Sequence, residues 1–283
     1  MAGMLYLVPT PIGNLGDISV RCREILAQAD FIAAEDTRVT LKLLNHLELK
    51  KPLVSYYEHN LKERGGYILD RIEAGESCAL CSDAGMPAVS DPGEVIVRDA
   101  HARGIPVVPV PAASAAVTAL CVSGQPTGRF VFEGFLPTNR RQKKERLAAL
   151  QNEERTVIFY EAPHKLPTTL QDLEQAFGPE RSLTICRELT KKYETAFRTT
   201  FSGALAHYEN EEPRGECVIV VEGKSLEEIE KEKAAAWEDM TVEEHMDLYL
   251  ERGLDRKDAM KQVAKDRGIS KRDVYQVLVE RKL

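Results

Sequence analysis

Short apolar runs alternate with amphipathic stretches over the first part of the chain. The apolar runs fall at Met4–Val8, Phe31–Ala34, Leu53–Tyr56, Cys78–Cys81 and Val107–Val110. The stretches between them repeat apolar residues with the period of a helix, at Ser19–Ala29, Leu41–Leu47, Lys62–Ala74 and Gly93–Arg103. This alternation predicts a mostly parallel sheet with helices on both faces. We therefore expect an N-terminal α/β domain over residues 1–123.

The pattern changes after the break Ser123-Gly124-Gln125-Pro126. New apolar runs follow at Phe130–Phe132, Thr156–Tyr160, Ser182–Cys186 and Glu216–Val221. Helical spacing of apolar residues separates them at about Arg141–Gln151 and Pro167–Phe177. We interpret residues 124–224 as a second α/β domain.

Residues 225–283 predict an acidic, alanine-rich helical linker that leads to a small helical tail. Thr241 and Glu244 can form a capping box for one helix, Arg256–Arg267 predicts a second, and Ser270 with Asp273 can cap a third that runs to about Glu280. The segment Met260–Tyr275 has the length and the turn glycine of a helix-turn-helix. Residues 241–283 carry ten cations and nine acids. Nucleic-acid contact and a packing or dimer-contact role are both open for this tail.

Two loops predict a ligand site. Leu5–Ile18 and Ser82–Gly93 are apolar, strand-like runs that end abruptly in glycine, proline and aspartate. Such endings bring backbone amides and a carboxylate to the carboxyl edge of a sheet. We expect one cofactor site to be shared by both loops.

Charge is unevenly distributed along the chain, although the net charge is −7. Asn139–Arg146 contains five cations and one acid, whereas Ser225–Asp239 contains six acids and two lysines. The acidic segment therefore masks a basic surface elsewhere. Arg140, Arg141, Lys143 and Lys144 are the candidate phosphate contacts. Cations in a first helical turn oppose the helix dipole, which favours this role over a solvated helix face.

The six cysteines lie mostly within apolar runs, and we expect them to be reduced core residues. Cys78 and Cys81 form a CxxC, but no second pair follows at zinc-site spacing, so we expect no metal. The start of the chain lacks the pattern of a signal peptide, and no apolar run approaches the length of a membrane span. These features predict a cytoplasmic protein without a membrane partner.

Six motifs follow one another along the chain, and they are Leu5–Ile18 with Ala34–Arg38, Ser82–Gly93, Phe132–Pro137, Phe159–Glu161, Arg187–Lys191 and Arg214–Glu216. In this order they resemble those of the ribosomal RNA small-subunit methyltransferase I family, of the tetrapyrrole-methylase fold superfamily. The resemblance spans roughly Met4–Lys224 and implies two α/β domains of the tetrapyrrole-methylase type, with a small C-terminal helical domain. It also implies that S-adenosylmethionine is used to methylate the ribose 2′-oxygen of a cytidine in the decoding region of 16S rRNA.

The resemblance implies a set of cofactor-binding residues, which are Ile12, Asp83, Gly85, Met86, Pro87, Ser114, Ala115 and Tyr160. The chain departs from the family pattern at Ser82 and Ala112, where glycine is usual, and at Met86, where threonine is usual. Glycine allows backbone conformations that other residues resist, so these departures constrain loops near the cofactor.

The chemistry of S-adenosylmethionine agrees with this assignment. The molecule has no phosphate, and Gly13–Asp17 does not fit the glycine pattern of a dinucleotide loop. Its hydroxyl, amine and carboxylate groups require acceptors and backbone amides between apolar walls. Asp83 can accept such protons, and the helix that opens at Ser114 can offer amides. The alternatives are a turn-forming aspartate and a simple helix cap.

Methyl transfer to a ribose requires alignment of the acceptor oxygen and removal of its proton. Glu188 is the candidate base or base-orienting group, and Arg187 or Lys191 can hold a neighbouring phosphate. Each can instead form a structural ion pair. Arg38 is a further candidate for RNA contact.

The resemblance implies small-subunit 16S rRNA as the partner and a homodimer as the assembly. Two other functions are open from the sequence. A methylase of the same fold can act on a tetrapyrrole or a modified protein side chain, and a protein with a degenerate cofactor site can bind RNA or the ribosome without catalysis.

Overall fold

The computed structural model describes residues 3–225, 227–229, 231, 235 and 240–280. The chain divides into two compact units, Met1–Gln151 with Arg155–Glu222 and Asn152–Glu154 with Gly223–Leu283. The larger unit contains both sheets, and the smaller unit contains the tail helices. Part of the predicted acidic linker lies outside the described residues.

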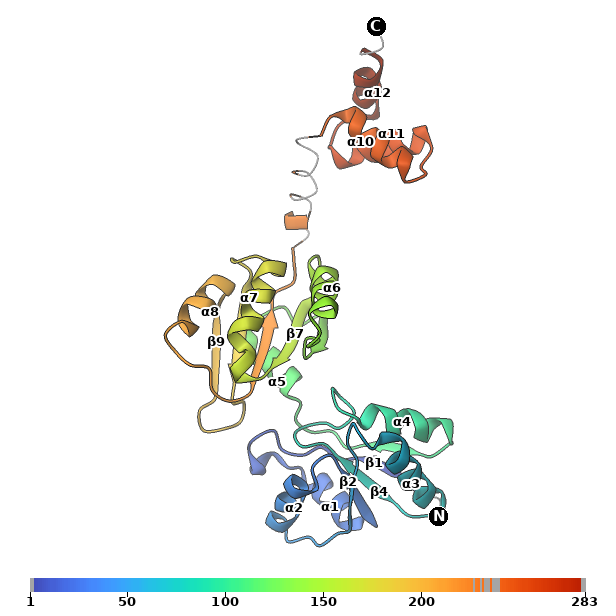
Figure 1. Ribbon diagram of the computed structural model, residues 1–283, viewed down its shortest axis with the longest axis vertical. Helices are drawn as coiled ribbons and strands as arrows, with labels where there is room; N and C mark the ends of the chain where they lie inside the picture. Colours follow the sequence, from blue (N-terminus) through green and yellow to red (C-terminus); the bar gives the residue numbers. More distant parts are fainter. Residues whose placement is uncertain (1–2, 226, 230, 232–234, 236–239, 281–283) are drawn as a thin grey trace. The chain divides into compact units, whose positions relative to one another are not determined.

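The first sheet consists of parallel strands in the order β3-β2-β4-β1-β5 (Figure 1). The strands are β1 (Leu5–Leu7), β2 (Phe31–Ala34), β3 (Leu53–Ser55), β4 (Cys78–Cys81) and β5 (Val107–Pro109). Leu7 lies opposite Leu80 on one side and Pro109 on the other. Strands β2 and β4 are buried along their whole length because helices cover both faces. The predicted parallel sheet is confirmed.

Two pairs of helices cover this sheet (Figure 1). One face packs against α1 (Val20–Gln28) and α2 (Thr37–His46), and the other against α3 (Leu61–Glu73) and α4 (Gly93–Ala102). Helix α2 begins at Thr37 rather than at the predicted Leu41. The reason is a polar cap, since the Asp36 carboxylate accepts the backbone N–H of Arg38.

The second sheet is mixed, in the order β6-β7-β10-β8-β9. Strands β6 and β7 are parallel, and the remaining pairs are antiparallel. The strands are β6 (Phe130–Gly134), β7 (Thr156–Glu161), β8 (Ser182–Arg187), β9 (Thr195–Thr200) and β10 (Cys217–Val221). One face packs against α5 (Ala115–Ser123), and the other against α6 (Arg140–Leu150), α7 (Leu166–Phe177) and α8 (Phe201–Tyr208).

Strand β9 and helix α8 were not predicted from the sequence. Residues 195–200 form an edge strand with mostly exposed or half-buried side chains, so they lack an apolar run. Helix α8 follows directly, and the Thr200 hydroxyl caps it by accepting the N–H of Gly203. The amphipathic pattern of so short a helix is weak.

The smaller unit contains α10 (Val242–Glu251), α11 (Arg256–Asp266) and α12 (Lys271–Glu280). The predicted capping box of Thr241 and Glu244 is confirmed. Ser270 and Asp273 exchange side-chain and backbone hydrogen bonds at the start of α12, as predicted. The three helices enclose a small apolar core, made up of Met246, Ala259, Val263, Ala264 and Val274.

No helix in the described part of the chain is long and apolar enough to cross a membrane. Five of the six cysteines are buried and unpaired, as predicted, but Cys121 is exposed on α5. Cys121 lies two residues before the end of α5, and the opposite face of this helix is the buried one. Burial raises the pKa of Cys78 to about 12, which keeps this thiol protonated.

Candidate active site

The two glycine- and proline-rich loops predicted to share a site are joined by backbone hydrogen bonds. Thr10 N donates to the carbonyl of Gly85 over 3.0 Å, and Gly85 N donates to the carbonyl of Thr10 over 2.9 Å. The Thr10 hydroxyl also donates to the carbonyl of Ser82 over 3.2 Å. The loop after β1 and the loop after β4 therefore form one structural piece.

The position of these loops follows from the sheet topology. Strands β1 and β4 are neighbours, but the helices that follow them, α1 and α4, lie on opposite faces of the sheet. The chain therefore leaves the two strands in opposite directions and opens a crevice at their carboxyl ends. Ligands of open α/β sheets bind at such switch points.

A cavity of about 420 Å³ opens in the larger unit at this place. Its size is that of a small-molecule site. The first sheet contributes its loops after β1, β2 and β4, and the second sheet contributes the ends of β7, β8 and β10. The lining residues are Ile12, Glu35, Ser82–Met86, Val89–Asp91, Ser114, Ala115, Phe135, Tyr160–Pro163, Leu189 and Glu216–Val218.

The cavity brings together seven of the eight sequence-predicted cofactor residues. Those that line it are Ile12, Asp83, Gly85, Met86, Ser114, Ala115 and Tyr160. Pro87 is not among the lining residues. It directly follows Met86 in the loop. The Met86 side chain also packs against the core of the first sheet.

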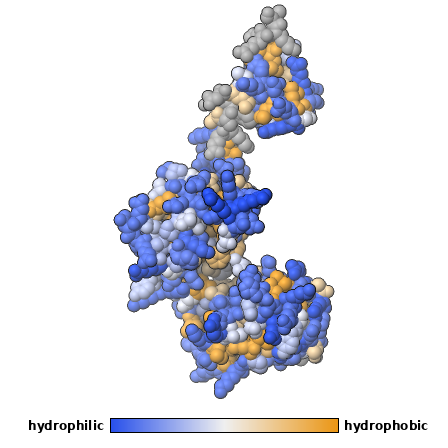
Figure 2. Space-filling view, viewed as in Figure 1, coloured by the Kyte–Doolittle hydropathy of each residue, from blue (hydrophilic) through white to orange (hydrophobic). Residues whose placement is uncertain are grey.

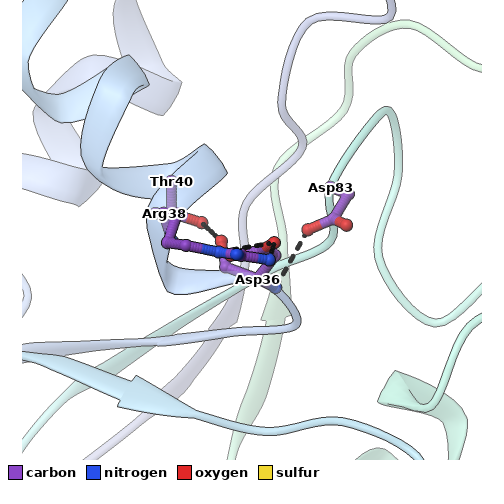
Figure 3. Close-up of polar contacts among 4 residues, drawn as sticks. All are labelled: Asp36, Arg38, Thr40 and Asp83. Atoms are coloured by element: carbon purple, nitrogen blue, oxygen red, sulfur yellow. Dashed lines mark hydrogen bonds and ion pairs between the residues drawn. The ribbon is translucent and has the colours of Figure 1, made fainter.

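Asp83 connects two loops at the rim of the cavity (Figure 3). Its Oδ1 accepts the backbone N–H of Asp36 over 3.0 Å, so it holds the start of α2 beside the loop after β4. The Asp36 carboxylate pairs in turn with the exposed guanidinium of Arg38 over 2.6 Å. Hydrogen bonds from Arg38 lower the pKa of Asp36 to about 2. Asp83 is thus more than a turn-forming residue.

Glu35 lies beside this group and lines the cavity. Burial raises the pKa of Glu35, and the nearby carboxylates of Asp83, Asp91 and Asp36 raise it further. The first-sheet side of the cavity is therefore a negative surface that favours a cationic group.

The first turn of α5 forms another wall. Ser114 is its N-cap residue, but its side chain makes no capping hydrogen bond. The Tyr160 hydroxyl instead accepts the N–H of Ala116 over 3.1 Å. Burial raises the pKa of Tyr160, so the phenol stays neutral. The Ser114 hydroxyl thus does not cap α5 in this structure, and one of the amides expected to meet a ligand already has a hydrogen-bond partner.

A strained turn closes the loop after β4. Ala88 and Ser90 have positive φ angles of 67° and 64°. The Asp91 carboxylate holds this turn by accepting the N–H groups of Ala88 and Gly93. A side chain at Gly93 would meet Asp91 Oδ1 at 2.7 Å, so glycine is required by this close approach. Strain of this kind is typical of ligand-binding loops.

Arg187 and Glu188, the predicted catalytic residues, do not line the cavity. Glu188 Oε1 accepts from Lys191 Nζ over 2.9 Å, and Lys191 also pairs with Glu216 over 3.0 Å. The hydrogen bond from Lys191 lowers the pKa of Glu188, which makes this carboxylate a weaker base. Arg187 lies 3.6 Å from Glu211.

In this structure, Arg187 and Glu188 therefore take part in ion pairs, which is the structural alternative considered for them. They shape the loop after β8, in which Glu188 and Thr190 have positive φ angles. Leu189, between them, points its apolar side chain to the cavity wall.

Comparison with known proteins agrees with the fold. Residues 4–205 match the family model of Tetrapyrrole (Corrin/Porphyrin) Methylases. The chain is 46% identical over 273 residues to ribosomal RNA small subunit methyltransferase I of Bacillus subtilis, which covers 96% of this chain and 93% of that protein. The corresponding protein of Halalkalibacterium halodurans is 47% identical over 275 residues, with 97% and 94% covered. The chain belongs to the ribosomal RNA small subunit methyltransferase I family.

A solved structure shows the same fold. Uroporphyrin-III C-methyl transferase from Thermus thermophilus, complexed with S-adenyl homocysteine, matches with a TM-score of 0.55 at 18% identity, covering 78% of this chain and 98% of that chain. The tetrapyrrole-methylase fold predicted from the sequence is therefore confirmed.

The departures from the usual family pattern are compatible with the loop conformation. Neither Ser82 nor Ala112 has a positive φ angle, so glycine is not needed at either position. The Ser82 hydroxyl donates to the carbonyl of Gly85 over 3.2 Å and is buried. Met86 supplies an apolar wall, as expected.

Some cavity residues were not assigned to the site from the sequence. Phe135, Leu189 and Glu216 line the cavity and lie within motifs shared with the family, so the signal was present in the sequence. Glu35 lies in the Ala34–Arg38 motif. Glu35 lies near Asp83 because β2 pairs with β4. The sequence does not show this pairing.

The predicted basic run occupies the start of α6 (Figure 2), where strongly hydrophilic side chains project from the surface. Not all of its cations are available to a ligand. Arg141 pairs with Glu145 over 2.8 Å, and Lys143 pairs with Asp172 of α7. Arg140 and Lys144 form no ion pair with any residue that the structure describes. These two are the strongest phosphate candidates of the run.

No group of three or more metal-ligating side chains occurs within the described ranges. Lys191 is committed to Glu188 and Glu216, so its expected contact with RNA would require it to exchange partners.

Proposed function

We propose that this protein transfers the methyl group of S-adenosylmethionine to 16S rRNA of the small ribosomal subunit, in the cytoplasm. The strongest support comes from one cavity, which is lined by the two hydrogen-bonded loops after β1 and β4, by the first turn of α5 and by the second sheet. Family membership supplies the substrate class, since the relatives are named for small-subunit ribosomal RNA. We further propose the 2′-oxygen of a cytidine in the decoding region as the acceptor.

The residues of the cavity suit this cofactor. Ile12, Met86 and Leu189 provide apolar walls for the adenine and the methionine stem. Ser114 has a hydroxyl that is not used for capping, and Asp83 has a second carboxylate oxygen that can accept hydroxyl or amine protons. The negative side formed with Glu35 favours the cationic sulfonium. When bound, S-adenosylmethionine supplies a methyl group on an excellent leaving group.

The chain must align the acceptor and accept its proton. We retain Glu188 and Arg187 as residues that act on the acceptor side, where Glu188 positions the loop through Lys191 and Glu216. Glu35 is a better proton acceptor than Glu188, because the pKa of Glu35 is raised whereas that of Glu188 is lowered, and Glu35 lines the cavity. Arg38, Arg140, Arg141, Lys143, Lys144 and Lys191 are the proposed RNA contacts.

The test is methyl transfer to small subunits purified from a strain that lacks this protein. Radiolabelled S-adenosylmethionine supplies the methyl group, and mass spectrometry of nuclease fragments maps it. We expect one ribose methylation in 16S rRNA that is absent without the enzyme. Label in a tetrapyrrole or a protein side chain would favour the alternative methylase, and calorimetry without saturable S-adenosylmethionine binding would favour a non-catalytic RNA-binding protein.

A further inference from the structure

The charges of the tail unit are separated by helix, although their sum is near zero. Helix α10 carries four acids, Glu243, Glu244, Asp247 and Glu251, and neither lysine nor arginine. Helices α11 and α12 carry six cations, which are Arg256, Lys257, Lys261, Lys265, Lys271 and Arg272. The same two helices carry four acids, Asp258, Asp266, Asp273 and Glu280, so their net charge is +2, beside −4 on α10.

The six cations are exposed. None of them forms an ion pair with a residue in the described part of the tail. Two of the acids on the same helices are already engaged. Asp266 accepts from Tyr249 and Gln262, and Asp273 accepts the N–H of Ser270 at the helix start. Exposed cations that form no ion pair are available to a polyanion.

Helix α12 presents a mixed basic and aromatic face. Lys271, Arg272, Tyr275, Gln276 and Val279 are exposed and recur at the spacing of one helix face. Val274 is fully buried and Leu278 packs against the same core, so the helix cannot turn this face inward. Tyr275 is 57% exposed, which leaves much of its side chain accessible.

The turn before α12 fixes this face relative to α11. Gly268 has a φ of 62°, and Ile269 N donates to the carbonyl of Ala264 over 3.0 Å. The two basic helices therefore form a preorganised pair, and binding would not have to order them.

These features fit RNA better than a protein partner. Protein interfaces are depleted of charge at their centre, whereas cations next to an exposed aromatic ring are typical of single-stranded nucleic-acid sites. The cations can neutralise phosphates, and the ring can stack on an unpaired base.

We propose that the α11–α12 face binds the RNA substrate, with Lys271 and Arg272 on phosphates and Tyr275 stacked on an unpaired base. This inference rests on the proposed function, because it names a second contact for the same substrate. The tail then contributes to substrate affinity and takes no part in the methyl transfer step.

The experiment uses the full chain and two probes, small subunits that lack the methylation and protein-free 16S rRNA. The variants are Lys271→Ala/Arg272→Ala and Tyr275→Ala. The matched control, Lys62→Ala/Arg64→Ala, removes the same charge from exposed positions on α3. Circular dichroism and thermal unfolding establish that each variant is folded.

We expect the double variant to flatten the dependence of log affinity on log salt by roughly 1.5, since each lost phosphate contact removes about 0.7–0.9. Tyr275→Ala should weaken binding to both probes by roughly tenfold, and Tyr275→Phe should restore it, because stacking needs only the ring. Affinity for S-adenosylmethionine and kcat at saturating subunits should stay at the parent values, as should all values of the control.

Three results would overturn the inference. If the variants bind both probes as the parent does, while the parent methylates 16S rRNA, the tail does not contact RNA and the proposed function stands. Lost binding to intact subunits with unchanged binding to protein-free rRNA would assign the face to a ribosomal protein. A parent that neither binds nor methylates either probe would overturn the proposed function together with this inference.

Discussion

Asp83 has one observed role and one proposed role at the residue scale. One carboxylate oxygen holds the backbone of Asp36 at the start of α2, and the other is available to a ligand in the cavity. An alanine at position 83 would remove both the carboxylate charge and the hydrogen bond to Asp36. A second variant that removes only the charge is therefore needed to separate ligand binding from the positioning of the loop.

We expect Asp83→Ala to weaken S-adenosylmethionine binding by about tenfold or more, because a charge-assisted hydrogen bond contributes about 1.5–3 kcal/mol. Asp83→Asn keeps an oxygen for the Asp36 amide and should show the loss due to charge alone. Calorimetry measures both, and Asp247→Ala, at an exposed position of α10, is the control. Parent-like affinity in a folded Asp83→Ala protein would remove Asp83 from the site.

The raised pKa of Glu35 predicts a pH dependence of stability. The folded chain binds this proton more tightly than the unfolded chain, whose pKa is near 4.5. The contribution is therefore fully present below pH 4.5 and is lost as the pH rises through the folded pKa.

Glu35→Gln should remove this contribution, so the free energy of unfolding should decrease less between pH 4 and pH 8 than in the parent. Urea unfolding at a series of pH values measures it, with Glu63→Gln at an exposed position of α3 as the control. Parallel pH profiles of the Glu35→Gln protein and the parent would contradict the prediction.

Helix α6 shows at the element scale that a basic run is not a uniform surface. Lys143 connects α6 to α7 through Asp172, whereas Arg140 and Lys144 have no described ion-pair partner. We therefore expect the stability contributed by this helix and its proposed RNA affinity to come from different residues.

Arg140→Ala/Lys144→Ala should lower the salt slope of RNA binding by roughly 1.5 and leave unfolding unchanged. Lys143→Ala should instead reduce the free energy of unfolding by up to about 1 kcal/mol, the usual range for a partly exposed ion pair. Filter binding across salt concentrations and urea unfolding measure the two effects. An unchanged slope in the double variant would identify the run as a solvated helix face.

Elements with a strong apolar period were predictable from the sequence, and weakly patterned elements were not. The buried strands β2 and β4 are continuous apolar runs, whereas the exposed edge strand β9 has no such signal. The first turn of α2 was missed because its stability comes from the Asp36 cap rather than from an apolar face.

The part of the candidate site that consists of two loops was predictable, because glycine, proline and aspartate mark these loops in the sequence. The Ser82–Gly93 and Leu5–Ile18 loops were assigned to one cavity from their sequence, and their hydrogen bonds join them. The contact with Glu216 was not predictable, because Glu216 meets Lys191 and Glu188 only through the pairing of β8 with β10. Spacing along the chain does not show such contacts.

The assembly belongs to the scale of the whole molecule. We propose a homodimer, because methylases of this superfamily are commonly dimeric and a ribosomal target presents a broad surface. A two-fold contact uses the same patch on both chains, so the assembly should stop at two. The exposed edge strand β9 is one surface that would be protected in this way.

Light scattering at micromolar concentration should give twice the 31.6 kDa mass of one chain. The mass should stay at this value across a dilution series. A mass near that of one chain throughout would reject the dimer, and this result would leave the cavity and its residues unaffected.

The reciprocal hydrogen bonds between Thr10 and Gly85 have a consequence for motion. Each residue is both donor and acceptor, so both amides are hydrogen-bonded and a separation of the two loops breaks both bonds at once. Amide exchange should therefore show equal protection at both positions, and the two should lose it together under mild denaturant. The two loops would then open as a single cooperative unit. A measurement of amide exchange on one loop would therefore also report the opening of the other.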